Sequence, residues 1–288
     1  MMNIGFIGTG VMGSSICKHL LKAGHTLHIY TRTKSKADEL IELGAAWYAT
    51  PVEVANQSEI VFTMVGYPKD VQQVYKEKNG LFESAKATTF IDLTTSTPQL
   101  AEELAKVGEE KGFTVIDAPV SGGDIGARDG VLSIMIGGDE KTVMDLLPVF
   151  ELFGKNIVYH GEPGAGQHTK MCNQIAIAST MIAVCESLSY GKKAGLNLSK
   201  VLESITQGAA GSWSLTNLGP KMIAEDYAPG FYIKHFVKDM GIALDEASRM
   251  NLDLPGLARA KSIYDELIEQ GFEEEGTQAI IRHYKTQW

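Results

Sequence analysis

Short apolar runs alternate with amphipathic helical repeats over the first half of the chain. The runs occupy residues 2–7, 27–30, 60–64, 89–92, 114–117, 132–137 and 157–160. Between them apolar residues recur every three or four positions, as at Ile16, Leu20 and Leu21. This alternation is typical of repeated strand–helix–strand units, so it predicts an α/β domain with a parallel, doubly wound sheet. Ligands of such sheets bind beside the carboxyl ends of the strands.

The second half of the chain carries helical patterns only. They cover residues 167–194, 198–207, 212–223, 236–250, 254–270 and 276–285. The first pattern is apolar on almost every face between Met171 and Cys185, which is typical of a buried helix. We therefore predict an α/β domain over residues 1–162 and an all-α domain over residues 163–288, joined by this long helix.

Composition narrows the classes of partner. The 288 residues carry a formal net charge of −9 without a cluster of Lys and Arg, which argues against nucleic acid and anionic membranes. The uncharged run 171–185 is shorter than a membrane span. Three cysteines without C-x-x-C spacing predict small, buried, reduced thiols. Since no basic leader precedes the first strand, we expect a cytoplasmic protein.

A glycine-rich turn follows the first predicted strand and opens a helix. It consists of Gly8, Thr9, Gly10, Val11, Met12 and Gly13. A G-x-G-x-x-G turn in this context is typical of Rossmann dinucleotide-binding domains, with pyrophosphate at the helix N-terminus. In that interpretation Gly8 permits the tight turn, Gly10 the approach of the pyrophosphate, and Gly13 the packing of helix on strand. The alternative is a glycine-rich turn without function.

The residues after the second strand indicate which dinucleotide binds. An acidic residue there would bind the ribose of NAD, but this chain has Thr31, Arg32, Thr33 and, further on, Lys36. A guanidinium among hydroxyls and ammonium groups suits the 2′-phosphate of NADP, because Arg donates two parallel hydrogen bonds. We predict NADP(H) over NAD(H). A solvated basic turn remains the alternative.

Two further loops follow predicted strands. The loop Val65-Gly66-Tyr67-Pro68 follows the strand at 60–64 and is expected to pass along the adenosine and ribose. Met64 and Val65 are therefore candidate cofactor contacts. Thr95 lies in the loop after Asp92, where it is expected to contact the nicotinamide side. N-capping of the following helix by Thr95, Ser96 or Thr97 explains these hydroxyls equally well.

The segment after the strand at 114–117 suits an anion. Ser121, Gly122 and Gly123 follow a proline and a valine, and a turn of this kind exposes backbone N–H groups and a hydroxyl. A carboxylate is the expected ligand.

Lys170 begins the long apolar helix within the stretch GAGQHTKMCNQ, residues 164–174. A lysine at the mouth of a buried helix is a candidate acid/base, because burial lowers the pKa of an ammonium group toward neutrality. The alternative is a lysine that extends along the helix end to reach water.

Four motifs in order together resemble the β-hydroxyacid dehydrogenase family. They read GFIGTGVMG at residues 5–13, DAPVSGG at 117–123, GAGQHTKMCNQ at 164–174 and FVKDMGIALDEA at 236–247. The resemblance covers the whole chain. It is greatest to the short members, which are 3-hydroxyisobutyrate dehydrogenases, tartronate semialdehyde (2-hydroxy-3-oxopropionate) reductases and glyoxylate or succinic semialdehyde reductases.

The resemblance implies roles for particular residues. It places Ser121, Gly122 and Gly123 in the carboxylate-binding loop, and Lys170 at the catalytic lysine. It places Asn173 and Gln174 in the substrate site; some members have Asn at the second position, and Gln favours the tartronate semialdehyde branch. Lys238 matches a lysine that closes over cofactor and substrate, and Thr95 a cofactor contact. Self-association as a homodimer or homotetramer is also implied.

The sequence thus predicts an NADP(H)-dependent oxidoreductase for a small β-hydroxyacid or semialdehyde, with Lys170 as general acid/base. An NAD-dependent 3-hydroxyisobutyrate dehydrogenase is the first alternative, and a non-catalytic cofactor-binding module the second. Imine reductases share the architecture but usually replace the lysine. No metal site is predicted, because no His/Asp/Glu cluster shows ligand spacing.

Overall fold

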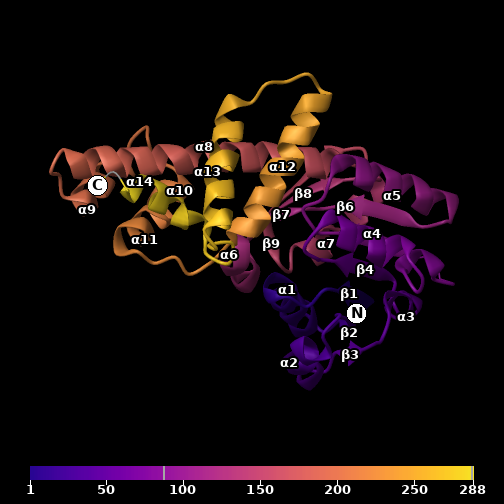
Figure 1. Ribbon diagram of the computed structural model, residues 1–288. Helices are drawn as coiled ribbons and strands as arrows, with labels where there is room; N and C mark the ends of the chain where they lie inside the picture. The colour runs from indigo at the N-terminus through magenta and orange to yellow at the C-terminus, as the bar shows by residue number, and fades with distance from the viewer. Residues whose placement is uncertain (87, 287) are drawn as a thin grey trace. The chain divides into compact units, whose positions relative to one another are not determined.

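The computed structural model describes residues 1–86, 88–286 and 288 (Figure 1). It divides into two compact units, Met1–Lys170 and Met171–Trp288. The sequence predicts a boundary between residues 162 and 163, whereas the division between the two compact units falls after Lys170, inside the long helix α8 (Ala165–Lys193). The difference arises because the first turns of α8 pack with the sheet of the first unit.

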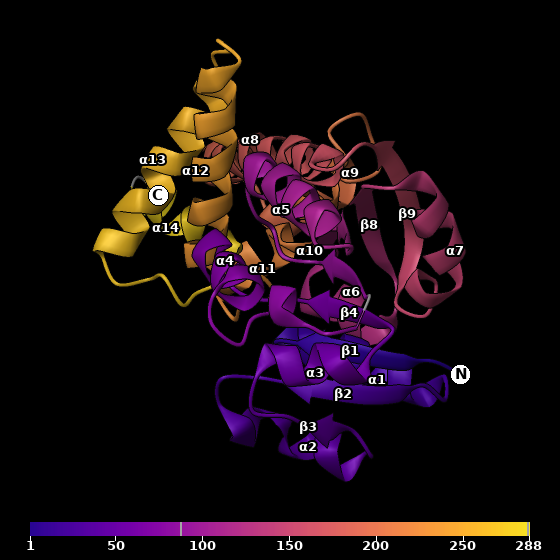
Figure 2. The same ribbon diagram turned by 90° about the vertical axis from the view of Figure 1, so that its right-hand side faces the viewer.

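The first unit contains a nine-stranded sheet with the strand order β3-β2-β1-β4-β5-β6-β8-β7, and β9 pairs with β8 (Figure 2). The strands are β1 (Asn3–Ile7), β2 (Thr26–Tyr30), β3 (Ala46–Trp47), β4 (Ile60–Thr63), β5 (Thr89–Asp92), β6 (Thr114–Asp117), β7 (Val120–Ser121), β8 (Leu132–Gly137) and β9 (Gly154–Gly161). The pairs from β3 to β6 are all parallel, so the predicted doubly wound α/β fold is confirmed.

The sheet is not parallel throughout. β8 runs antiparallel to β6 and to β7, which departs from the predicted parallel sheet. The connection from β6 to β8 holds the short helix α6 (Gly123–Asp129) and the two-residue strand β7, which itself pairs antiparallel with β8. β9 pairs with β8 in parallel after the crossover helix α7 (Glu140–Phe150).

Helices cover both faces of this sheet. They are α1 (Val11–Lys22), η1 (Lys34–Ala37), α2 (Asp38–Glu42), α3 (Pro51–Gln57), α4 (Pro68–Lys76), η2 (Leu81–Glu83) and α5 (Pro98–Glu110), besides α6 and α7. Alternate residues of β1 enter different cores: Ile4 and Phe6 belong to one buried cluster and Ile7 to another. Burial on both faces is why the strands read as continuous apolar runs.

The start of α5 shows which of the hydroxyls of Thr95, Ser96 and Thr97 caps the helix. Thr97 is the N-cap, and its side chain accepts the backbone N–H of Leu100. Pro98 occupies the first helical turn, where its missing N–H costs nothing. Thr95 therefore does not cap α5.

The second unit is helical. After α8 it contains α9 (Leu198–Ile205), α10 (Trp213–Asn217), α11 (Gly219–Ala224), α12 (Ile233–Arg249), α13 (Pro255–Glu269), η3 (Thr277–Ile280) and α14 (Ile281–Lys285). The single helix predicted at 212–223 is two helices: α11 begins at Gly219 with Pro220 in its first turn, since proline cannot donate a hydrogen bond that would continue the preceding helix. α12 and α13 lie side by side (Figures 1 and 2).

The long helix α8 supplies much of the core of the second unit. Its buried apolar residues there are Met171, Ala178, Met181, Val184, Cys185 and Leu188. Among the described residues it is the one helix with the length and composition to cross a membrane. Of its apolar 18-residue stretch, 39% is buried. One face of the helix packs in this core, but Cys172, Ala176, Ser179 and Ala183 are exposed, so the expected burial of nearly every face is not seen.

The prediction of three buried thiols is wrong for one of them. Cys17 and Cys185 are buried, whereas Cys172 on α8 is exposed. The apolar run from 171 to 185 hid this difference, because the helix is not buried on every side.

Candidate active site

The three fingerprint glycines have different surroundings. Gly8 has φ +100°, and a Cβ there would lie 2.1 Å from the backbone oxygen of Met64. A Cβ on Gly13 would lie 2.1 Å from the backbone oxygen of Gly8. Helix α1 can therefore pack against this turn only because residue 13 has no side chain. At Gly10 a Cβ would meet nothing within 4 Å. Open space at the second glycine, at the N-terminus of α1, fits the approach of a dinucleotide pyrophosphate.

The basic loop after β2 is exposed to solvent. The side chain of Arg32 is 72% exposed, and its Nη1 lies 3.1 Å from Oδ1 of the buried Asp70. Asp70 also accepts the backbone N–H of Tyr67, at the start of α4. The loop is joined to the fingerprint because the hydroxyl of Thr9 donates to the carbonyl of Lys36. Thr31 is half-buried, and Thr33 and Lys36 are exposed.

Hydrogen bonds connect the loops that follow β4 and β5. The backbone N–H of Val65 donates to the hydroxyl of Thr94 at 3.0 Å, and the N–H of Thr94 donates to Asp92 at 2.9 Å. Met64, Val65 and Thr95 are half-buried. These residues lie at the carboxyl ends of adjacent parallel strands, where a doubly wound sheet binds its ligand.

Asp117, the last residue of β6, anchors the first turn of α8. Its carboxylate accepts the backbone N–H groups of Gly164 and Gln167, both at 2.8 Å. Burial raises the pKa of Asp117, and these N–H donors oppose that rise. A Cβ on Gly166 would lie 2.4 Å from the oxygen of Met135, so the turn fits against the sheet only with glycine there.

Lys170 lies one turn further along α8 and is buried. It is 6% exposed, and its Nζ donates to the backbone oxygen of Val120 at 2.8 Å. A lysine that extends to reach water would keep its ammonium exposed, so this alternative does not describe Lys170. The amine instead lies at the start of the loop predicted to bind a carboxylate.

The backbone of that loop requires its glycines. Gly122 has φ +132° and Gly123 has φ +63°, conformations that L residues rarely adopt. Ser121 and Gly123 are half-buried and Gly122 is exposed. The first unit thus brings Lys170 beside Val120, the residue before this serine.

In the second unit, polar side chains form a continuous chain. Nδ2 of Asn173 donates to Oε1 of Gln174 at 2.7 Å, and Nε2 of Gln174 donates to Asp239 at 2.6 Å. Nζ of Lys238 lies 2.8 Å from the other oxygen of Asp239. Gln174 is fully buried, so its side chain holds the neighbouring amide of Asn173 in addition to any role toward substrate. Asn173 follows Lys170 by three residues, on nearly the same helix face.

Four polar residues with clear positions were absent from the predicted site. They are Asp70, Asp117, Gln167 and Asp239. Each is buried, and a buried carboxylate or amide needs hydrogen-bond partners. The available signal was a polar residue at the end of an apolar strand or within an apolar helix face, but spacing does not reveal its partners.

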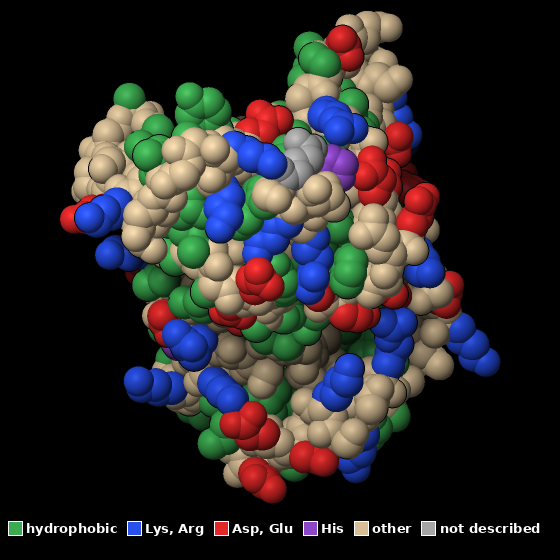
Figure 3. All heavy atoms as spheres, turned by 60° about the vertical axis from the view of Figure 1, so that its left-hand side comes forward, with side chains coloured by type: hydrophobic (Ala, Val, Ile, Leu, Met, Phe, Trp, Pro, Cys, Tyr) green, Lys and Arg blue, Asp and Glu red, His purple; other side chains and the backbone are tan. Residues whose placement is uncertain are grey.

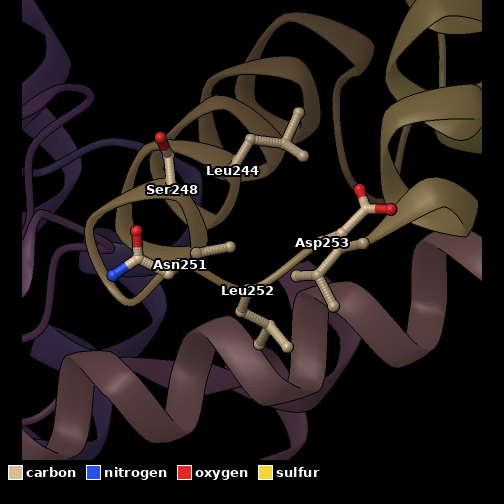
Figure 4. Close-up of a pocket in the computed structure, with 7 residues that line it drawn as sticks. Leu244, Ser248, Asn251, Leu252 and Asp253 are labelled. Atoms are coloured by element: carbon tan, nitrogen blue, oxygen red, sulfur yellow. The ribbon is translucent and has the colours of Figure 1, made fainter.

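Other surface features carry no predicted site residue. A pocket at the turn between α12 and α13 includes Leu244, Ser248, Asn251, Leu252 and Asp253 (Figure 4). On the face shown in Figure 3, Lys and Arg side chains are interspersed with acidic, apolar and other side chains. No group of three or more His, Cys, Asp or Glu among the described residues is arranged to hold a metal ion.

Comparison with known families covers nearly the whole chain. Residues 3–161 match the NAD binding domain of 6-phosphogluconate dehydrogenase. Residues 164–284 match a family described as NAD-binding of NADP-dependent 3-hydroxyisobutyrate dehydrogenase. Both halves therefore have the character of NAD(P)-dependent dehydrogenases.

Individual proteins agree with this assignment. The chain is 51% identical to the Arabidopsis thaliana protein named "Probable 3-hydroxyisobutyrate dehydrogenase-like 1, mitochondrial", over 96% of this chain and 84% of that protein. It is 38% identical to the 2-hydroxy-3-oxopropionate reductase of Escherichia coli, over 98% and 96%. The solved structure of Mycobacterium tuberculosis 3-hydroxyisobutyrate dehydrogenase with L-serine superposes with a TM-score of 0.90 at 29% identity, over 98% and 99%. The chain belongs to the β-hydroxyacid dehydrogenase family, whose members are NAD(P)-dependent oxidoreductases.

Proposed function

We propose that this protein interconverts a small β-hydroxyacid and its semialdehyde with NADP(H), and that Lys170 is the general acid/base. The observation that carries the proposal is the buried amine of Lys170, which donates to the backbone oxygen of Val120 at 2.8 Å. The next residue, Ser121, begins the glycine-containing turn that suits a carboxylate. An acid/base and a carboxylate-binding turn are thereby neighbours.

The chemistry of this arrangement follows from charge. Gly10 would admit the pyrophosphate of NADPH at the N-terminus of α1, Gly8 and Gly13 would shape the turn around it, and Arg32 would hold the 2′-phosphate. The cofactor would supply the hydride. As the carbonyl oxygen gains negative charge, the ammonium of Lys170 gives it a proton; in oxidation the amine removes the hydroxyl proton. General acid/base catalysis of this kind contributes about 10²–10⁴-fold to the rate.

The remaining residues orient the substrate. The hydroxyl of Ser121 and the backbone N–H groups of Gly122 and Gly123 hold the carboxylate, which sets its distance from the amine of Lys170. Asn173 presents its amide one helical turn beyond Lys170 and hydrogen-bonds the reacting oxygen. The chain from Asn173 through Gln174 to Asp239 fixes the direction of that amide, because an ionised carboxylate only accepts hydrogen bonds.

Two observations support the choice of cofactor and substrate. The exposed guanidinium of Arg32 stands where an NAD-dependent protein has an acid, which favours NADP(H). The 38% identity with 2-hydroxy-3-oxopropionate reductase favours tartronate semialdehyde, with succinic semialdehyde and glyoxylate in the same class. The second candidate is an NAD-dependent 3-hydroxyisobutyrate dehydrogenase, favoured by the 51% identity with the Arabidopsis protein of that name.

The setting of the reaction belongs to the same proposal. We propose a cytoplasmic homodimer or homotetramer that acts on a small carboxylate and binds neither nucleic acid nor membrane. The apolar residues of α8 outside the helical core need cover, which self-association supplies.

The deciding experiment is a matrix of steady-state rates. Tartronate semialdehyde, succinic semialdehyde, glyoxylate and methylmalonate semialdehyde are each assayed with NADPH and with NADH. We expect the highest kcat/KM for one of the first three with NADPH. A clear preference for methylmalonate semialdehyde with NADH would select the second candidate, and no turnover of any pair would refute the enzymatic assignment.

A further inference from the structure

The side chain of Gln167 bridges two residues of the loop between β5 and α5. Gln167 lies on the first turn of α8 and is fully buried. Its Oε1 accepts the backbone N–H of Ser96 at 2.9 Å, and its Nε2 donates to the carbonyl oxygen of Thr94 at 2.8 Å. The amide therefore holds both neighbours of Thr95.

A carboxamide satisfies both of these backbone groups at every pH. A backbone N–H donates and a carbonyl accepts, so the side chain between them must offer one acceptor and one donor. An ionised carboxylate lacks the donor, and an apolar side chain of similar length lacks both. The residue type at position 167 is thus dictated by the loop that it holds.

Gln167 also connects the loop to the helix that carries Lys170. Its own N–H donates to Asp117, so both its backbone and its side chain are held. On the other side of the loop, the hydroxyl of Thr94 accepts the N–H of Val65. A continuous series of bonds within the first unit therefore runs from Val65, through Thr94 and Gln167, to the turn that presents Lys170.

We propose that Gln167 is a positioning residue for the reaction, which holds the Thr94–Ser96 loop at a set distance from the amine of Lys170. This inference rests on the proposed function, in which Thr95 lies on the nicotinamide side and Lys170 transfers the proton. Hydride and proton must reach the two atoms of one carbonyl group, so the loop and the amine must keep a fixed separation. A misplacement of about 1 Å can lower the rate on the order of 10²-fold.

The test compares two variants of Gln167 with a matched control. Gln167→Met removes both hydrogen bonds and keeps the side-chain length, and Gln167→Glu keeps an acceptor. The control is Gln278→Met, since Gln278 is 2% exposed and its Nε2 donates to the carbonyls of Asp226 and Ala228 in the second unit. Measurements are kcat, KM, NADPH affinity by fluorescence, and hydrogen exchange of the Ser96 amide.

For Gln167→Met we expect kcat to fall by about 10- to 100-fold, with NADPH affinity changed by less than about threefold. The Ser96 amide should exchange faster, because its acceptor is gone. In Gln167→Glu that amide should stay protected, while kcat relative to the parent protein should recover as the pH falls. Protonation gives the introduced carboxyl a donor for the Thr94 carbonyl. Gln278→Met should lose stability without these effects.

Distinct outcomes overturn the inference. They are a Gln167→Met kcat within about twofold of the parent, or an equal loss of kcat in Gln278→Met. If Gln167→Met does not fold, the test rests on Gln167→Glu. A kcat that does not change with pH relative to the parent protein would then overturn the positioning role. Failure of the proposed function is separate: the unaltered protein would turn over no substrate, or Lys170→Met would stay active, and the positioning role would fall with it.

Discussion

The amine of Lys170 donates to the backbone carbonyl of Val120 at 2.8 Å, across fifty positions of sequence. This contact places the one buried lysine of the first turns of α8 at the start of the Ser121–Gly123 turn. The start of α8 is held by Asp117, whose carboxylate accepts hydrogen bonds from the backbone N–H groups of Gly164 and Gln167. The geometry of the proposed reaction follows from this pairing.

Replacing Lys170 should remove proton transfer and leave cofactor binding intact. We expect Lys170→Met to lower kcat by about 10²–10⁴-fold, the usual contribution of a general acid/base. Lys170→Arg should be nearly as slow, because a guanidinium keeps its proton at all pH values of interest. Single-turnover rates measure the loss of proton transfer, and NADPH titration measures cofactor binding separately. Near-parental turnover in Lys170→Met would contradict the assigned role.

Alanine at two of the turn glycines, Gly8 and Gly10, should separate folding from cofactor binding. Gly10→Ala should fold normally but weaken NADPH binding by about tenfold or more, since its Cβ enters only open space. Gly8→Ala should lose at least about 2 kcal/mol of stability, because its Cβ would overlap the Met64 oxygen in a backbone that L residues rarely adopt.

Gly24→Ala is the control for this comparison. Gly24 has φ +83° and open space around it, so only the backbone strain of about 1 kcal/mol should appear. Thermal unfolding and NADPH titration of all three variants provide the measurement. Equal NADPH affinity of Gly10→Ala and the parent protein would place the pyrophosphate elsewhere.

Arg32 should determine the preference for NADP(H). Arg32→Gln should raise KM for NADPH by about 10- to 100-fold, because charged hydrogen bonds to a phosphate contribute roughly 1.5–3 kcal/mol. The KM for NADH should change little, since NAD lacks the 2′-phosphate. Lys69→Gln, on the exposed start of α4, serves as a charge-matched control. An equal loss with both dinucleotides would argue against recognition of the 2′-phosphate.

The three thiols should differ sharply in reactivity. Burial raises the pKa of Cys17 and of Cys185, so both stay protonated and shielded near neutral pH. Cys172 is exposed on α8. A disulfide reagent should label one thiol rapidly in the native protein and all three after denaturation. Rapid native labelling that persists in Cys172→Ser would contradict this assignment.

Protonation of His28 should lower the stability of the first unit in mild acid. Burial, and then the charge of Lys86, lower the pKa of His28, and its Nδ1 lies 3.1 Å from the hydroxyl of Tyr48. Its Nε2 is buried without a hydrogen-bond partner. Because the folded pKa is below 6.5, this contribution to stability is present above 6.5 and is lost as the pH falls through the folded value.

Denaturant unfolding of the parent protein and of His28→Leu at several pH values measures that contribution. The parent should lose more stability than the variant as the pH falls below 6.5. Part of the loss should remain in the variant, because burial also lowers the pKa of His25 and His235. Identical pH dependence of the two proteins would show that His28 titrates normally in the fold.

By itself the sequence determined the alternation of strands and helices, the fingerprint turn from Gly8 to Gly13 and the candidacy of Lys170. Those features are local, because periodicity, glycine spacing and a charge at the start of an apolar helix can be recognised within a few dozen residues. The break between α10 and α11 was also local, but the apolar pattern across Pro220 concealed it.

Only the tertiary structure decided which polar groups meet. Val120 and Lys170, or Gln167 and Thr94, come together because β5, β6 and β8 are neighbours in the sheet and α8 begins beside them. The strand order and the antiparallel direction of β8 set the distances between these residues. Neither property follows from spacing along the chain. The partners of a buried polar group depend on that packing, since burial demands a hydrogen bond without specifying its source.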